Sequence, residues 1–217
     1  MVRSYPRNLT YLKELAETRF EAARFERIRG DLNAAIENCK KGADVLQTIN
    51  KSNTGIQPAG VVSAAGIFEM AETLLLRGYS SAAARDAEDA TERLAEVLKA
   101  DPQDAVAQRS LARGRILQAK VLAVSGSLSV AKKYFLDAAE RADRLVALDH
   151  TNASAMSIQA TAYAELALAL RKAGQAQEAS QSMHKCSDLI KSMRASGQTI
   201  SSELLQLLKD AGNGDED

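Results

Sequence analysis

Two cysteines and two histidines are the residues of this 217-residue chain that most readily carry nucleophilic or metal chemistry. A cysteine nucleophile needs a base within hydrogen-bond reach. Cys186 and His184 are two positions apart, so on a helix their side chains point to different sides. Cys39 is far from both in the sequence, and the spacing gives no disulfide framework. We therefore expect both cysteines to be buried packing residues and His150 to be exposed.

The sequence lacks the short motifs that carry catalytic or cofactor chemistry. It contains no HExxH, no zinc-ligand spacing, no Walker A motif and no GxGxxG. Acidic residues cluster at Glu69 and Glu72 and between positions 86 and 92, and such clusters are expected to be solvated helix faces. The sequence thus predicts no enzyme, no catalytic residue, no cofactor and no metal site.

The balance of charges bears on the kind of partner. The chain has 28 basic and 28 acidic residues, whereas nucleic-acid binding usually needs a basic excess that displaces counterions from phosphates. The N-terminus lacks the apolar core of a signal peptide, and no apolar run approaches the roughly 18 residues that span a bilayer. We expect a cytoplasmic protein with no nucleic-acid partner and no membrane partner.

The composition favours helices. Apolar residues make up 46% of the chain, aromatic residues only 4%, and there are three prolines. Alanine recurs throughout, and it loses no side-chain entropy in a helix. Small side chains also allow helices to approach closely, so these residues predict tightly packed helices.

Glycines divide the chain at a constant period of 48 residues. They stand at Gly30, Gly78, Gly126 and Gly174. Alanine keeps the same step five residues after each glycine (Ala35, Ala83, Ala131 and Ala179) and seven before it (Ala23, Ala71, Ala119 and Ala167). A second break follows at Asn53, Asp101, Asp149 and Gly197. A fixed period of this length is typical of repeat proteins.

Between the breaks the apolar residues follow a helical period. Tyr163, Leu166 and Leu170 recur on one face, for example. Glycine between two such stretches ends a helix in a left-handed turn, while Asp101 suits an N-cap region and Pro102 suits a first turn. Each repeat is therefore expected to be two antiparallel helices that must stack on neighbouring repeats to bury their apolar faces.

The spacing of these residues resembles the tetratricopeptide repeat. That family has a small residue in the first helix, glycine at the turn, alanine five residues later, a further small residue, and then Asp-Pro. The third repeat matches this order with Ala119, Gly126, Ala131, Ala138 and Asp149. The usual repeat has 34 residues. The extra residues here add seven to each helix, close to two turns, so the apolar faces keep their direction.

The resemblance implies an all-α, right-handed α-α superhelix of four helix–turn–helix repeats with a C-terminal capping helix. We expect one domain over 1–217, with repeats at 6–53, 54–101, 102–149 and 150–197. A capping helix is expected at 198–212, where Leu204, Leu205, Leu207 and Leu208 would cover the last repeat, followed by a disordered tail at 213–217.

The resemblance also implies a function and a binding surface. Such long repeats are similar to arrays attached to bacterial signalling proteins, including serine/threonine kinases and adenylate cyclases. In this family the first helix of each repeat lines a concave groove, which predicts a partner-binding surface of six residues: Phe20, Arg24, Phe68, Glu72, Arg113 and Lys120. Alternatively, the two phenylalanines pack between repeats.

The leading hypothesis is a non-catalytic scaffold that binds a peptide or a partner domain, as the interaction module of a larger signalling protein. An oligomerisation module, which would make the chain a homo-oligomer, is one alternative. A regulatory domain that senses a ligand or peptide is another.

Overall fold

The computed structural model describes residues 8–52 and 60–212, and in these residues every regular element is an α-helix. The predicted all-α class is therefore confirmed. The helices are α1 Leu9–Ile28, α2 Leu32–Ser52, α3 Gly60–Leu76, α4 Ser80–Ala100, α5 Ala105–Val124, α6 Leu128–Leu148, α7 Ala153–Lys172, α8 Ala176–Ala195 and α9 Ser202–Gly212. The tail predicted at 213–217 lies outside the described residues.

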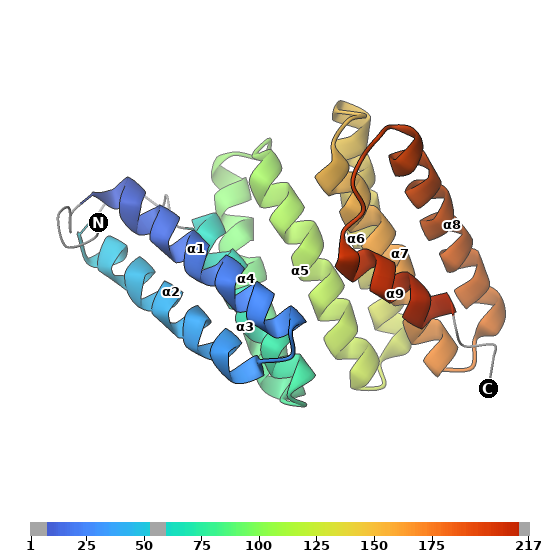
Figure 1. The fold of residues 1–217 in the computed structure, drawn as a ribbon, viewed down its shortest axis with the longest axis horizontal. Helices are drawn as coiled ribbons and strands as arrows, with labels where there is room; N and C mark the ends of the chain where they lie inside the picture. The colour runs from blue at the N-terminus through green and yellow to red at the C-terminus, as the bar shows by residue number, and fades with distance from the viewer. Residues whose placement is uncertain (1–7, 53–59, 213–217) are drawn as a thin grey trace. The chain divides into compact units, whose positions relative to one another are not determined.

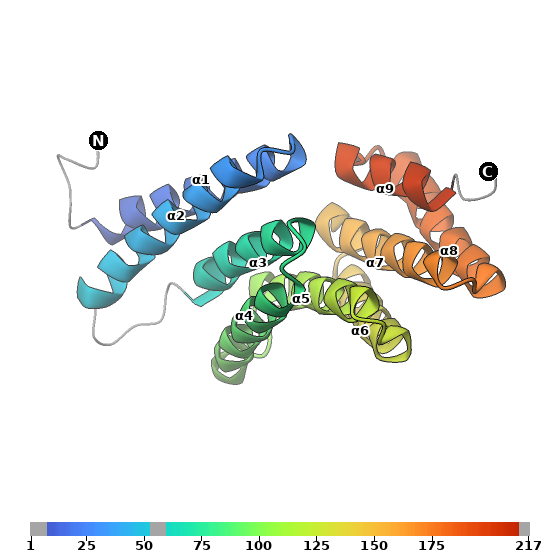
Figure 2. The same cartoon turned by 90° about the horizontal axis from the view of Figure 1, so that it is seen from below.

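The chain forms two compact units, residues 1–110 and 111–217, and the boundary between them falls inside α5. In the N-terminal unit α1 packs against α2, α3 packs against α4, and the first pair lies on α3 (Figure 1). In the C-terminal unit α7 packs against α6 and α8, and α9 lies on α7 (Figure 2). Consecutive helices are therefore packed in pairs, as the period predicts.

The four repeated glycines end the first helix of each pair in the same way. Their φ angles lie between 74° and 84°, the left-handed region that side chains with a Cβ disfavour. Each glycine N–H donates to the carbonyl three residues back, and the next N–H donates to the carbonyl five residues back. In the second pair the latter bond joins Tyr79 N to Leu74 O at 2.9 Å. These bonds satisfy carbonyls that the helix end leaves open, so one turn geometry explains the period.

Polar side chains begin the helices that follow the second breaks. Asp104 and Asn152 cap α5 and α7, since the Oδ1 atom of each accepts a backbone N–H from the first turn. Asp101 and Asp149 lie three residues earlier and accept N–H groups within the connecting turn. Pro102 lies in that turn as well, so its expected place in the first turn of a helix was wrong.

The repeated alanines lie in the core. All eight that keep the 48-residue step are at most 1% exposed, which confirms that the small residues mark close helix packing. Larger apolar side chains fill the remaining space in each unit. In the N-terminal unit they include Leu12, Phe20, Leu46, Ile49 and Val62.

The C-terminal unit has two clusters of buried side chains. The larger one joins α5, α6 and α7 around Phe135, which is 1% exposed. The second joins α7, α8 and α9, and it contains Leu204 together with Met156 and Met193 of the last helix pair. The predicted capping helix is therefore present as α9, in which Leu204 is buried and Leu207 and Leu208 are partly buried. The expectation that Leu205 also covers the last repeat was wrong, because this side chain points away from the cluster and is 36% exposed.

Candidate partner-binding surface

The two phenylalanines predicted to contact a partner are in the core. Phe20 is 6% exposed and Phe68 is 8% exposed. The Phe20 ring, on α1, lies so close to Gly42 of α2 and Gly66 of α3 that a Cβ on either glycine would overlap it. Phe20 therefore packs between the first and second helix pairs, as the alternative interpretation of the sequence has it, and neither ring is presented to a partner.

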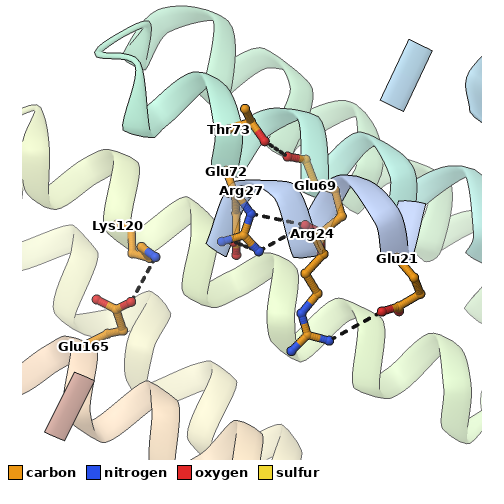
Figure 3. A network of polar contacts seen from close by, with 8 residues as sticks. All are labelled: Glu21, Arg24, Arg27, Glu69, Glu72, Thr73, Lys120 and Glu165. Atoms are coloured by element: carbon orange, nitrogen blue, oxygen red, sulfur yellow. Dashed lines mark hydrogen bonds and ion pairs between the residues drawn. The ribbon is translucent and has the colours of Figure 1, made fainter. Parts of the chain in front are cut away.

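The four charged residues of the predicted surface lie at the solvent boundary. The side chains of Arg24, Lys120 and Glu72 are 33%, 30% and 30% exposed, and Arg113 is exposed. Arg24, Glu72 and Lys120 occupy the same place in their repeats, six residues before the turn glycine. Arg24 lies on α1, Glu72 on α3 and Lys120 on α5 (Figure 3).

A half-buried cluster of three charged side chains joins α1 to α3. Arg27 Nη2 lies 3.0 Å from Glu69 Oε2 and 2.8 Å from Glu72 Oε2, and Arg27 Nε also donates to Glu69 at 3.3 Å (Figure 3). The side chains of Arg27, Glu69 and Glu72 are 12%, 21% and 30% exposed. The expectation that the two acids belong to a solvated face was wrong, because the neighbouring helix supplies a guanidinium that covers them.

The cluster perturbs the ionisation of its members. Burial, and then the adjacent Glu72 carboxylate, raise the pKa of Glu69 to about 7, while Arg27 and Arg24 act in the opposite direction. Burial also raises the pKa of the Cys39 thiol to about 12, with a smaller contribution from Glu69. The Glu69 carboxyl is therefore poised to gain or lose a proton near neutral pH.

Another ion pair between first helices is found in the C-terminal unit. Lys120 Nζ on α5 lies 2.9 Å from Glu165 Oε1 on α7 (Figure 3). Glu165 is nine residues before Gly174, as Glu69 is nine residues before Gly78. Both glutamates therefore bind a cation from the first helix of the preceding pair. The shared spacing is a signal in the sequence that could have identified this contact.

The residues that could do nucleophilic or metal chemistry lie apart. Cys39 and Cys186 are buried free thiols, as predicted, while His150 and His184 are exposed. Burial raises the pKa of the Cys186 thiol to about 11, which opposes thiolate formation. Within 8–52 and 60–212, no three His, Cys, Asp or Glu side chains are grouped so that they could hold a metal ion. None of the helices that the structure describes is both long and apolar enough to cross a bilayer.

Exposed apolar side chains lie near the glycine turns of the N-terminal unit, and the sequence analysis did not predict them. Phe25, Ile28, Leu76 and Tyr79 are each at least 50% exposed. Arg29 lies over the Phe25 ring, 5.6 Å from its centroid, and Arg77 lies over Tyr79 at 5.7 Å. The α1–α2 and α3–α4 turns lie at the same end of the unit (Figure 1). Apolar surface of this kind is common where proteins bind one another.

Comparison with known proteins gives a structural likeness only. No protein-family model and no curated protein matches the sequence. Among solved structures, the chain resembles the crystal structure of MamA at 16% sequence identity, with 89% of this chain and 94% of that chain covered and a TM-score of 0.34.

Proposed function

We propose that this chain is a non-catalytic scaffold that binds a peptide or a partner domain, and that it is the interaction module of a larger cytoplasmic signalling protein. The observation that carries the proposal is the series of charged side chains on consecutive first helices, at Arg24, Glu72, Arg113 and Lys120. The four repeats are proposed to act as one domain, because a helix pair buries its apolar face only against its neighbours.

Apolar side chains of a partner must contact residues other than the two phenylalanines predicted from the sequence. Phe20 and Phe68 are buried in the core. Of the six predicted residues, only the four charged ones therefore remain to contact a partner and provide specificity. Ile28 and Leu76 are 50% and 61% exposed, and each lies two residues before a turn glycine on a first helix. We propose that apolar side chains of the partner contact Ile28 and Leu76, because apolar anchors within a polar rim supply most of the affinity of such interfaces.

The ends of the helix pairs favour partner binding over end-to-end self-assembly. In the fourth repeat Ile158 and Ala162 are buried against the third repeat. At the same positions the first repeat has Glu14 and Thr18, and both are exposed. A polar face of this kind does not drive the stacking of a second copy. At the other end α9 already covers the last pair.

A charge-reversal series tests the proposed surface. Arg113→Glu reverses an exposed charge on a first helix, and Arg144→Glu reverses an exposed charge on the second helix α6 as a matched control. Proteins captured from the lysate of the source organism are quantified for the wild type and both variants. We expect Arg113→Glu to lose a partner that Arg144→Glu retains, with unchanged circular dichroism. Equal capture by all three proteins would argue against the surface.

A matched pair of substitutions tests the apolar anchors. Leu76→Ser removes an apolar side chain that is 61% exposed, and Leu148→Ser removes one that is 79% exposed at the end of α6. Because both leucines are exposed, neither change should lower stability by more than about 0.5 kcal/mol. We expect only Leu76→Ser to weaken binding of the captured partner in a titration. If Leu148→Ser weakens binding equally, the anchors have been misplaced.

A further inference from the structure

Two neighbouring glycine turns of the N-terminal unit carry a group of exposed side chains. Arg27 of α1 lies 2.8 Å from Glu72 of α3, and both residues are close to the C-terminal ends of their helices. The α1–α2 and α3–α4 turns therefore lie side by side (Figures 1 and 2). The exposed side chains at these two turns are called the turn patch, and they are Phe25, Ile28, Arg29, Leu76, Arg77 and Tyr79.

The glycine turn itself does not require apolar side chains. The fourth repeat makes the same turn hydrogen bonds around Gly174. It has Lys172 at the place of Leu76 and Gln175 at the place of Tyr79, and both polar residues are exposed. Leu76 and Tyr79 are 61% and 55% exposed, so packing within the chain does not require them either. A group of exposed apolar side chains that neither the turn nor the core needs indicates a binding surface.

Each turn also holds a guanidinium against an aromatic ring. The guanidinium of Arg29 lies 5.6 Å from the centroid of the Phe25 ring, and that of Arg77 lies 5.7 Å from the centroid of the Tyr79 ring. A guanidinium that lies over a ring keeps its N–H donors at its edge. Carboxylates bind such an edge through two parallel hydrogen bonds. The turn patch therefore offers anion-binding groups directly beside apolar ones.

The acidic residues near the patch lie at its first turn. Glu26 is 3.8 Å from Arg29, and the Asp31 carboxylate accepts the Ala34 N–H at 2.9 Å at the start of α2. Within residues 8–52 and 60–212, no carboxylate forms an ion pair with Arg77, whose contact is with the ring beside it. The second turn therefore combines exposed apolar side chains with a cation that can bind a carboxylate of a partner.

We propose that the turn patch binds an acidic peptide segment, in which aspartate or glutamate side chains stand next to large apolar ones. This proposal rests on the scaffold function proposed above and names the chemistry of the partner. Apolar side chains of the segment contact Ile28 and Leu76, and a carboxylate of the segment binds Arg77. Glu26 and Asp31 oppose the binding of a broad anionic surface such as a membrane, whereas a short segment that contacts the second turn avoids them.

Selection of phage-displayed random peptides on the full chain tests this chemistry. The Kd of each enriched peptide is measured by fluorescence polarisation with the wild type and with variants. We expect the enriched peptides to carry a net negative charge beside apolar residues. Arg77→Glu should raise their Kd about tenfold or more, because a charged hydrogen bond is lost and a repulsion replaces it. Arg144→Glu is the matched control, since it reverses an exposed arginine on α6, and it should leave the Kd unchanged.

An exchange of charges distinguishes direct binding from an effect on the fold. A peptide whose acidic residues are replaced by lysine should bind the wild type weakly and Arg77→Glu more tightly, because the two charges are then complementary again. Leu76→Ser should weaken the binding of the acidic peptide to the wild-type charges, whereas Leu148→Ser should not. Leu76 and Arg77 are both exposed, so the circular dichroism of these variants should match that of the wild type.

Several outcomes would overturn the proposal. One is the enrichment of basic or uncharged peptides, or of no peptide at all, and another is equal binding to Arg77→Glu and the wild type. Cosedimentation with phosphatidylserine vesicles, or a dimer of the chain, that Arg77→Glu abolishes would show that the patch serves a membrane or a second copy instead. Peptides that are lost in Arg113→Glu but not in Arg77→Glu would contradict the turn patch and leave the proposed scaffold function standing.

Discussion

The ring of Phe20 fills the space that a side chain at Gly66 would need. A Cβ at Gly66 would overlap three atoms of the ring, which itself is 6% exposed. Gly66 lies on α3 and Phe20 on α1, so this contact sets how closely the first helix pair approaches the second. The large side chain of Phe20 is therefore accommodated by the absence of a side chain at Gly66.

Gly66→Ala should therefore destabilise the N-terminal unit by about 1–3 kcal/mol, because the ring has to move within a packed core. Phe20→Leu should also destabilise the unit, but it frees the space beside position 66. The double variant is expected to lose less stability than the two single changes together. Urea unfolding of all four proteins gives the coupling free energy, and strictly additive changes would contradict the contact.

Gly126→Ala should destabilise the C-terminal unit through the backbone alone. Its φ is 81°, and a Cβ would meet no atom within 4 Å. The expected loss is about 1–2 kcal/mol, since an L residue is strained at this φ. Gly126→Asn should lose less, because asparagine tolerates the left-handed region. Thermal unfolding compares the variants, and an alanine variant as stable as the asparagine variant would contradict this explanation.

Arg27→Met should lower stability more than Lys120→Met. The first change removes the cation that two half-buried carboxylates share, and about 1–3 kcal/mol is lost when such charged groups lose a hydrogen-bond partner. The second change removes the cation whose described ion pair is with Glu165. Arg27→Met should also raise the pKa of Glu69 further, since Arg27 normally lowers it. Urea unfolding at pH 7 and pH 5 tests both points: the loss caused by Arg27→Met should be smaller at pH 5, where Glu69 is protonated.

Leu204 and Leu205 are neighbours on α9 with opposite environments. Leu204 is 2% exposed within the apolar cluster of α7 and α8, whereas Leu205 is 36% exposed. Leu204→Ala should cost about 2–5 kcal/mol. Leu205→Ala should change stability by about 0.5 kcal/mol or less. Equal losses in chemical denaturation would show that α9 does not cover the last helix pair through Leu204.

The amino-acid sequence by itself determined the helices, their turns and most of the small residues in the core. Only glycine adopts the positive φ of the turns without strain, so its recurrence reports a backbone geometry directly. The alanines that keep the period are buried for an equally local reason, because only small side chains allow two adjacent helices to pack closely. The leucines after the fourth repeat likewise indicated a helix with one apolar face. In the structure α9 packs its apolar face, with Leu204, Leu207 and Leu208, on the last helix pair.

Only the tertiary structure decided which side chains of the first helices face a neighbour. Periodicity shows that Phe20 and Arg27 lie on one helix, but it does not distinguish the side that packs on α3 from the side that meets solvent. Gly66 and Glu69, which receive these two side chains, are 46 and 42 residues further along the sequence and come within reach only when the pairs stack. The environment of Glu69 is a product of that stacking, because a carboxyl gains a proton near neutral pH only where packing removes water and places a second carboxylate beside it.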